Sequence, residues 1–380
     1  MGYKAFTDCI EIAGSACQPF VGTKKYISTG TVDTDHIVAS DIEIVDYSGR
    51  PSRANLEVSA GDVLFAKMQG TKKTLLIDDM LSNNVYSTGF CAVKAKKGII
   101  TDKCLYHLLT SRTFLDQKDK NCSGATQKAI TNGGLRKISV KIPDYLEQER
   151  IGEQLDRLTA ITNQRRTELQ QLDNLVKARF VEMFGNPVAN EKEWRTISLD
   201  DACDGIGDGL HGTPEYDENG EYPFINGNNL IDGTIEITPS TKKVDESTYR
   251  KHYIEITSNA ILISINGTLG KMAFYRGEKV MLGKSACYCN LKPTVNRKFV
   301  YAVMKSDAFA EFLESNSTKS TIKNVGLKAM RGFQLILPPN ELQLRFVEFS
   351  RQIDKSKFVV QQALDKAQLL FDSLMQKYFG

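Results

Sequence analysis

Residues 146–185 read LEQERIGEQLDRLTAITNQRRTELQQLDNLVKARFVEMFG, and residues 341–380 read ELQLRFVEFSRQIDKSKFVVQQALDKAQLLFDSLMQKYFG. The two stretches align without a gap at an offset of 195, so that Gln148 meets Gln343, Arg150 meets Arg345 and Phe184 meets Phe379. Apart from Gly152, neither has an internal Pro or Gly, and apolar residues recur three and four positions apart. This spacing predicts two long amphipathic helices related by duplication.

Each predicted helix carries one apolar seam. In the first it comprises Ile151, Leu155, Leu158, Leu169, Leu172, Val176 and Met183, and in the second Phe346, Ile353, Val360, Leu364, Ala367, Phe371, Leu374 and Tyr378. At about 1.5 Å per residue each helix is about 57 Å long, more than a small domain can cover. The nearest partner is the other copy, which predicts an antiparallel coiled coil. The alternative is that the two helices are buried in separate cores.

The composition excludes several classes of protein. A chain of 380 residues with 41% apolar and 25% charged residues has room for two or three cores. No apolar run approaches 18 residues and the first ten residues do not resemble a signal peptide, so we expect a cytoplasmic protein without membrane contact. The eight cysteines are scattered, which predicts free thiols and no metal site. A net charge of +3 permits a nucleic-acid partner without requiring one.

The segments beside the helices are related as well. Residues 1–145 combine short extended runs (25–28, 42–45, 62–65) with a helix over 102–117 and a strand over 137–142, which predicts a mixed α/β domain. Residues 187–340 repeat that order: residues 194–199 open the domain, strands follow over 222–225 and 261–265, and a helix follows over 299–313. Ser111 falls on Ser306 at the offset of 195, and Gly70-Thr71 falls on Gly267-Thr268 at 197. We therefore predict a tandem repeat with pseudo-two-fold symmetry: a domain (1–145), a helix (146–186), a second domain (187–340) and a second helix (341–380).

Patterns that resemble catalytic signatures fail in context. Residues 207–212 match G-x-G-x-x-G, but Thr213-Pro214 follows where a nucleotide-binding helix should begin. Residues 277–285 end in Gly-Lys-Ser with one residue too many for a P-loop, which indicates the start of a strand instead. Residues 337–340 (LPPN) lack the residues that hold the target amine in amino-methyltransferases. The four histidines and the carboxylates form no catalytic pattern, so we predict a protein that is not an enzyme.

What remains is a set of Gly-rich and amide-rich loops in both halves: 69–73, 123–128, 208–216, 226–229, 266–268 and 317–323. Lys and Arg position phosphates, whereas Asn, Gln and Arg read base edges. Any single loop is better explained as a turn, but recurrence in both halves shifts the balance towards DNA contact. The candidate DNA-contact residues are Lys72, Lys73, Gln127 and Lys128 in the first domain, and His211, Tyr216, Asn226, Asn228, Asn266, Lys271, Lys319 and Lys323 in the second.

The order of domains and helices, together with several motifs, resembles the specificity subunit of type I restriction-modification systems across the whole chain. The motifs are residues 194–199 at the start of a domain, DGLHGTP (208–214) leading to YPFI (222–225), NGTLGK (266–271), and P-x4-Q-x-R at the start of both helices. In the first domain, Phe6 stands where a Trp is common, and residues 68–72 depart from the usual Asn-Gly-Thr-x-Gly.

The resemblance implies a non-catalytic adaptor. Each domain would be a target-recognition domain reading one half of an asymmetric bipartite site in double-stranded DNA, with the helices as spacer. Two modification (methyltransferase) subunits would dock along the spacer, and restriction subunits would join them. S-adenosylmethionine, ATP and Mg would be bound by those partners and no cofactor by this chain. Ile161, Phe180, Phe349 and Phe358, off the seam, are candidates for partner docking. The alternative is a coiled-coil scaffold that binds proteins and has no DNA specificity.

Overall fold

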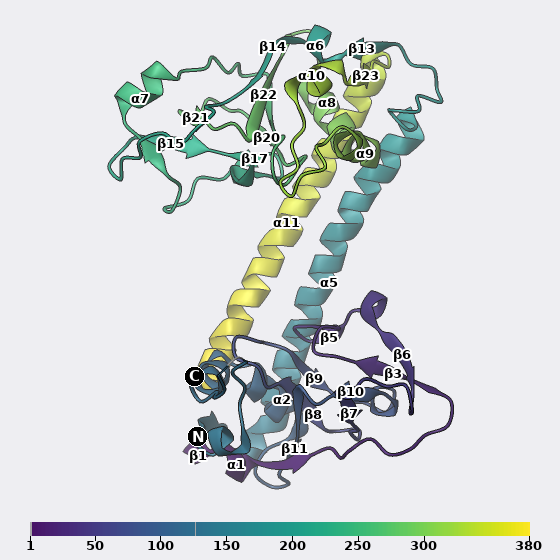
Figure 1. Ribbon diagram of the computed structural model, residues 1–380, viewed down its shortest axis with the longest axis vertical. Helices are drawn as coiled ribbons and strands as arrows, with labels where there is room; N and C mark the ends of the chain where they lie inside the picture. Colours follow the sequence, from purple (N-terminus) through teal and green to yellow (C-terminus); the bar gives the residue numbers. More distant parts are fainter. Residues whose placement is uncertain (1, 126) are drawn as a thin grey trace. The chain divides into compact units, whose positions relative to one another are not determined.

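The computed structural model describes residues 2–125 and 127–380 and divides the chain into two compact units (Figure 1). Unit 1 comprises residues 1–168 and 360–380, and unit 2 comprises residues 169–359. Both units are mixtures of helices and short strands, as the sequence predicts. Each of the two long helices contributes one part to each unit.

Besides its parts of the long helices, unit 1 contains β1 (Gly2–Ala5), α1 (Phe6–Cys9), β2 (Ile10–Ala13), β3 (Thr23–Ile27), β4 (Val32–Asp33), β5 (His36–Ile37), η1 (Ala39–Asp41), β6 (Glu43–Asp46), β7 (Ala54–Leu56), β8 (Val63–Ala66), β9 (Thr74–Leu76), η2 (Leu81–Asn83), β10 (Val85–Ser87), β11 (Phe90–Ala95), α2 (Asp102–Thr110), α3 (Arg112–Lys120), α4 (Asn132–Leu135) and β12 (Ser139–Ile142). Its two four-stranded sheets have the orders β2-β11-β8-β9 and β6-β3-β10-β7. The antiparallel pair β1-β12 joins the beginning of the unit to the segment that precedes the first long helix.

Unit 2 contains β13 (Thr196–Ser198), α6 (Leu199–Ala202), β14 (Cys203–Asp208), β15 (Tyr222–Ile225), η3 (Gly227–Asn229), β16 (Leu230–Ile231), β17 (Thr234–Ile235), β18 (Lys243–Val244), α7 (Glu246–Lys251), β19 (Ala260–Ser264), β20 (Met272–Phe274), β21 (Met281–Leu282), β22 (Ala286–Leu291), α8 (Arg297–Met304), α9 (Asp307–Ser315), α10 (Leu327–Gly332) and β23 (Gln334–Ile336). Its sheet β14-β22-β19-β20 repeats the order of β2-β11-β8-β9, and the pair β13-β23 repeats β1-β12. The main sheet and the two-stranded pair therefore have the same strand order in both domains, whereas the other sheet has four strands in unit 1 (β6-β3-β10-β7) and three in unit 2 (β18-β15-β21).

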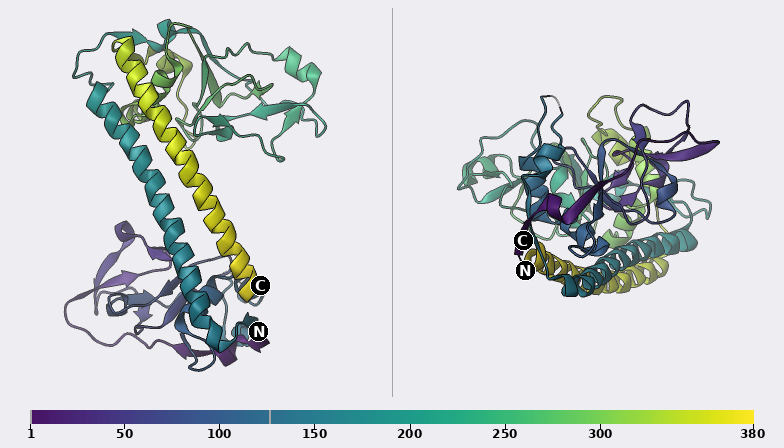
Figure 2. Two further views of the ribbon diagram at one scale, coloured as in Figure 1. Left: turned by 180° about the vertical axis from the view of Figure 1, so that it is seen from behind. Right: turned by 90° about the horizontal axis from the view of Figure 1, so that it is seen from below.

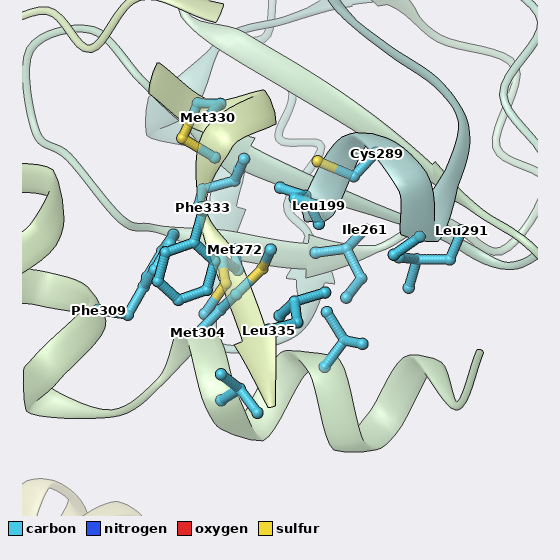
Figure 3. Close-up of a cluster of buried hydrophobic side chains, with 14 of the residues drawn as sticks. Leu199, Ile261, Met272, Cys289, Leu291, Met304, Phe309, Met330, Phe333 and Leu335 are labelled. Carbon is cyan, nitrogen blue, oxygen red and sulfur yellow. The ribbon is translucent and has the colours of Figure 1, made fainter. Parts of the chain in front are cut away.

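The main core of unit 2 contains side chains of the sheet, the short helices and the long helices. Figure 3 shows residues of the sheet and the short helices in this core. Ile261 and Cys289 come from the sheet, Phe309 from α9 and Phe333 from the segment before β23. Phe184, from a long helix, joins the same cluster with its ring centre 5.0 Å from that of Phe299. Burial of aromatic rings supplies a large share of the stability of such a core.

The two long helices, α5 (Tyr145–Phe184) and α11 (Asn340–Phe379), confirm the predicted helical segments. Every residue of the predicted seams is buried or half-buried, so the periodicity identified the inward face correctly. Within each unit, the parts of the two helices lie side by side and run in opposite directions (Figure 2). In unit 1, Arg166 Nη2 lies 3.4 Å from Gln368 Oε1, and in unit 2, Lys357 Nζ lies 2.6 Å from Asp173 Oδ1.

The P-x4-Q-x-R motif at the start of each long helix has a structural role. Gln148 Nε2 donates to the carbonyls of Pro143 (3.0 Å) and Ile99 (2.9 Å), and its Oε1 accepts from the N–H of Thr101 (2.9 Å). In the second copy, Gln343 Nε2 donates to the carbonyl of Pro338 (2.8 Å). Both side chains are buried. The glutamine thus satisfies buried backbone groups where the chain turns into the helix.

Replacing Gln148 with Leu is expected to destabilise unit 1 by about 2–4 kcal/mol, because three buried backbone groups lose their partners. Urea unfolding followed by far-UV circular dichroism measures the change. Gln154→Leu, on an exposed face of the same helix, is the matched control and should stay within about 0.5 kcal/mol of the wild type. Equal effects of the two substitutions would show that the buried hydrogen bonds are not important.

One prediction about the short helices is wrong. The sequence predicted single helices over 102–117 and 299–313, but the structure divides each into two, α2 and α3 in unit 1 and α8 and α9 in unit 2. The breaks are at Ser111 and Ser306, whose hydroxyls cap the following helices by accepting from Phe114 N–H (3.2 Å) and Phe309 N–H (3.3 Å). Serine favours an N-cap because its side chain satisfies a free N–H at the helix start. The serine pair seen in the sequence alignment marks these caps.

Candidate nucleic-acid interface

In unit 1, two loops predicted separately from the sequence are joined by backbone hydrogen bonds. The hairpin loop, residues 67–73, connects β8 to β9, and the return loop, residues 123–129, precedes α4. The N–H of Gln69 donates to the carbonyl of Lys128 (2.9 Å), and the N–H of Ile130 donates to the carbonyl of Lys67 (2.9 Å). Thr126, in the predicted 123–128 loop, lies outside the described residues. The structure thus brings together the loops that carry Lys72, Lys73, Gln127 and Lys128.

Unit 2 repeats this arrangement with different side chains. Its hairpin loop, residues 265–271, connects β19 to β20, and its return loop comprises residues 318–324. The N–H of Gly267 donates to the carbonyl of Lys323 (2.8 Å), and the N–H of Val325 donates to the carbonyl of Ile265 (2.8 Å). Asn266 Nδ2 also lies 3.3 Å from Asn324 Oδ1. Asn266, Lys271, Lys319 and Lys323 therefore belong to one pair of loops.

The hydrogen bonds that close the two hairpins correct the register inferred from the glycines. The N–H of Ala66 donates to the carbonyl of Lys73 (2.9 Å), and the N–H of Ser264 donates to the carbonyl of Lys271 (2.8 Å). These pairs are offset by 198, so the match of Gly70 with Gly267 at 197 is wrong by one residue. Both glycines have positive φ (76° and 77°), which favours glycine. The two hairpin loops have this conformation at neighbouring positions and not at the same position. Lys73 and Lys271 are therefore equivalent.

The predicted residues of unit 1 differ in how accessible they are. Lys72, Gln127 and Lys128 are exposed, whereas Lys73 is half-buried and its Nζ donates to the carbonyl of Thr29 (2.7 Å). An ammonium held by a backbone carbonyl keeps its charge but has fewer orientations available. Lys72 and Lys128 are thus suited to phosphate contact and Gln127 to a base edge.

In unit 2, the hairpin loop and the return loop line a groove of about 930 Å³ together with residues of α8 and α9. Lys271 and Lys323 both line this groove, and Lys319 is exposed on the same return loop. The ammonium of Lys323 forms an ion pair with Glu314. Lys305 Nζ lies 2.9 Å from Asp232 Oδ1, and this hydrogen bond holds the pKa of the Asp232 carboxyl below its usual value. The groove therefore contains carboxylates that are paired with lysines.

A second hollow of unit 2, of about 260 Å³, gathers three further predicted residues, Tyr216, Asn226 and Asn228. Lys242, which the sequence interpretation did not select, lines it as well, with Nζ 5.9 Å from the centre of the Tyr216 ring. A phenol ring beside amide groups and an ammonium offers a stacking face, hydrogen bonds to base edges and a phosphate contact.

Ser285 joins this hollow to the hairpin loop. Its hydroxyl donates to Asn226 Oδ1 (2.8 Å) and accepts from the N–H of Gly227 (2.9 Å), and its carbonyl accepts from the N–H of Ile265 (3.1 Å). A Cβ on Gly227 would stand 2.6 Å from the Ser264 Cβ, so only glycine permits this approach. In the sequence, Ser285 ends the imperfect P-loop pattern of residues 277–285. The start of β22 at Ala286 confirms that this pattern precedes a strand.

His211 lies apart from the residues of this hollow. It is exposed, and its Nε2 lies 2.8 Å from Asp208 Oδ2 at the end of β14. Residues 213–226 contain no helix, which agrees with the interpretation that residues 207–212 are not a nucleotide-binding turn. A Cβ on Gly209 would stand 2.0 Å from the carbonyl oxygen of Leu282, so the glycine is explained by close packing of two chain segments.

The four residues predicted to dock partners fall into three groups. Ile161 and Phe358 are exposed on the long helices. Phe349 is half-buried, with the guanidinium of Arg179 5.9 Å from its ring centre. The prediction for Phe180 is wrong: it is 4% exposed, and its ring lies 5.5 Å from that of Phe346 in the core of unit 2. The seam widens near the end of α5 because the helix there packs against the domain as well as against α11.

Two further results concern the described residues. They contain no group of three His, Cys, Asp or Glu side chains arranged to hold a metal ion, and the eight cysteines are free thiols. Among these residues no helix combines the length and apolar character needed to cross a membrane.

Comparison with known proteins gives one family. Residues 12–171 and 191–366 match the family model described as Type I restriction modification DNA specificity domain, one match for each half of the chain. The EcoBI specificity subunit of Escherichia coli is 20% identical over 76% of this chain and 67% of its own length. The StySPI specificity subunit of Salmonella potsdam is 21% identical over 93% of this chain and 80% of its own length.

A solved structure supports the same fold. The type I restriction-modification S subunit from M. genitalium superposes with a TM-score of 0.55 at 15% identity, covering all of this chain and 96% of that one. The two family matches coincide with the two halves in which the paired loops recur. The chain therefore belongs to the family of type I restriction-modification DNA specificity domains.

Proposed function

We propose that this chain is the DNA sequence-specificity subunit of a type I restriction-modification complex and that its two domains read the two halves of an asymmetric bipartite site. The observation that carries the proposal is the recurrence of one loop arrangement on a sheet of the same strand order, with different side chains in the two copies. A common backbone presents the loops in the same way to two half-sites, whereas different side chains select different bases.

The candidate contacts divide by chemistry. The exposed lysines 72, 128 and 319 supply positive charge for phosphates, which fixes position without selecting sequence. Gln127, Asn228 and the Asn226–Tyr216 hollow supply amide groups and an aromatic face for bases. His211, which is exposed beside Asp208, and Asn266, on the hairpin loop of unit 2, complete the proposed set.

The long helices are proposed as the spacer between the two readers. In this proposal, residues 1–145 and 187–340 are target-recognition domains, and residues 146–186 and 341–380 form an antiparallel coiled coil about a pseudo-two-fold axis. The packing of the two helices within each unit and the duplication at an offset of 195 support it. The length of the helices would then set the number of base pairs between the half-sites.

The chain is proposed to act without catalysis of its own. Two methyltransferase subunits would dock on the spacer, with Ile161, Phe358 and the half-buried Phe349 among the contacts. Those subunits would bind S-adenosylmethionine and methylate a flipped base, and restriction subunits would use ATP and Mg. The exposed apolar side chains of Leu369 and Leu370 extend the apolar surface available on α11.

Selection from a random duplex pool by the chain assembled with its methyltransferase tests the function. We expect one sequence in two parts separated by unspecified base pairs, and affinity that falls steeply with salt as phosphate contacts are screened. Selection of one continuous motif would contradict the proposal. The absence of any salt-dependent affinity for DNA would instead favour the scaffold alternative.

Two substitutions separate base reading from phosphate contact. Asn228→Ala is expected to weaken the binding free energy for the selected sequence by about 1–3 kcal/mol, because an amide that reads a base edge is lost. The base preference in one half-site should be relaxed as well. Lys72→Ala is expected to weaken binding to all sequences alike. The slope of log K against the logarithm of the salt concentration should become shallower by about one. Titrations at several salt concentrations measure both effects. Asn219→Ala, at another exposed position, serves as the control, and the assignment of Asn228 fails if the two asparagine variants behave alike.

A further inference from the structure

Lys118, on α3, is a fully buried lysine that the predicted contacts do not include. Its Nζ donates to the carbonyls of Thr71 (2.7 Å) and Met68 (3.1 Å) and lies 3.5 Å from the carbonyl of Ala66. Asp119 Oδ1 lies 3.2 Å away. Three of these four oxygens belong to the backbone of the hairpin loop or to the strand residue directly before it.

A buried ammonium is costly unless oxygen atoms replace its lost water. Here the replacement comes mainly from the hairpin loop, so the charge remains satisfied only while the loop keeps this conformation. Thr71 Oγ1 adds a hydrogen bond to the carbonyl of Met68 (2.5 Å) within the same loop. Lys118 thus holds the loop that presents Lys72 and Lys73.

The second domain holds its hairpin loop with a different residue. Leu313 occupies the position of Lys118 on the equivalent helix, and its Cδ1 would stand 3.1 Å from a Cβ on Gly270 of the hairpin loop. The polar group comes instead from buried Ser264, which accepts from the N–H of Lys271 (2.9 Å) and donates to the carbonyl of Thr268 (2.5 Å). In unit 1 the position of Ser264 is taken by Ala66, which is also buried.

Two equivalent positions that contact the hairpin loop, one on the strand before it and one on a helix, therefore have opposite polarity in the two domains. Unit 1 pairs Lys118 with Ala66, and unit 2 pairs Leu313 with Ser264. In each domain, one of these two buried side chains is polar and forms hydrogen bonds with the backbone of the hairpin loop. The other buried side chain of the pair is apolar. This complementary change suggests that holding the loop is the shared requirement, while the residue that does it is free to differ.

We propose that Lys118 and Ser264 are positioning residues for sequence discrimination, each fixing the hairpin loop of its own domain against DNA. This inference rests on the proposed DNA-reading function. Neither side chain is available to touch DNA, because both are fully buried. A fixed loop places its side chains against one base pattern, whereas a loosened loop accommodates several.

The test compares discrimination in the two half-sites. In the assembled methyltransferase complex, Lys118→Leu is expected to reduce the preference for the selected sequence over single-base mismatches at least tenfold in one half-site and to leave the other half-site unchanged. Ser264→Ala, which removes only one hydroxyl, is expected to do the same in the opposite half-site. The double variant Ala66→Ser with Lys118→Leu installs the pair found in unit 2 and should restore most of the lost discrimination.

A purely structural role would give a different pattern. Lowered stability with uniform weakening of binding to all sequences, or unchanged discrimination in both half-sites, would overturn the inference. If Lys118→Leu unfolds unit 1, Ser264→Ala decides by the same criterion, because the smaller change keeps the fold. Failure of the wild-type complex to select any bipartite sequence would contradict the proposed function itself, whereas selection by the wild type with undiminished discrimination in the variants would contradict only this inference.

Discussion

Inserting four residues into each long helix, after Thr167 in α5 and after Ala367 in α11, is expected to lengthen the gap in the DNA target by one to two base pairs. Four helical residues add about 6 Å, and each base pair occupies about 3.4 Å of duplex. Both insertions are needed because the two helices are paired. The contact between Arg166 and Gln368 shows that the two insertion points lie opposite each other within unit 1. Both half-sites should stay the same, since no loop changes. Selection from a random duplex pool with the assembled complex measures the gap.

The control for this experiment is the same four residues inserted after Gly49, an exposed position between β6 and β7. That insertion adds length to the chain but not to the helices, so the gap should not change. A gap that stays the same in the helix variant, with both half-sites still selected, would mean that the helices do not act as the spacer.

Replacing Phe379, at the end of α11, with Ala is expected to destabilise unit 1, which contains the first 168 residues of the chain. Phe379 is 1% exposed and belongs to the core of unit 1 with Met375 and Tyr378. Removing a buried phenyl ring costs about 3–5 kcal/mol. Discrimination should be lost in the half-site read by unit 1 and kept in the other.

The only tryptophan makes the measurement specific. Trp194 packs against the core of unit 2, and its Nε1 donates to the carbonyl of Phe184 (3.0 Å). In Phe379→Ala, far-UV circular dichroism should show an earlier loss of structure, while the Trp194 fluorescence transition stays near that of the wild type. Ser373→Ala, an exposed change on α11, should alter neither. An equal shift of both signals in Phe379→Ala would show that the two units unfold as one.

Much of the fold could be predicted because its strongest signals are local and repeated. Helical periodicity without interruption located α5 and α11 to within a residue or two, and the seam predicted which faces are buried. The P-x4-Q-x-R motif marks the buried Gln148 and Gln343 in the sequence, whereas their hydrogen-bond partners follow from the structure. The helix break was not predicted, because a run such as 102–117 keeps its apolar spacing through Ser111, and only the backbone shows that Ser111 is a cap.

The candidate site was predicted in pieces. The loops themselves were identified from Gly and amide residues, but their pairing was not, since it depends on contacts between distant parts of the chain. Phe180 was misjudged for a related reason: helical periodicity describes one face, and the packing of α5 against a whole domain adds a second. Nothing in the local sequence marks Lys242, and the imperfect P-loop pattern that contains Ser285 gives no sign of its bonds to Asn226 and Gly227.

The sequence by itself determined that this protein is a duplicated α/β chain with two long helices, because periodicity and repetition are properties of residues that follow one another. It also indicated the family, through the order of these parts. Only the tertiary structure decided which residues hold the loops. Lys118 reaches Thr71 across 47 positions and Ser285 reaches Asn226 across 59. Such hydrogen bonds depend on how strands and helices bring distant residues together, and no local pattern encodes that distance.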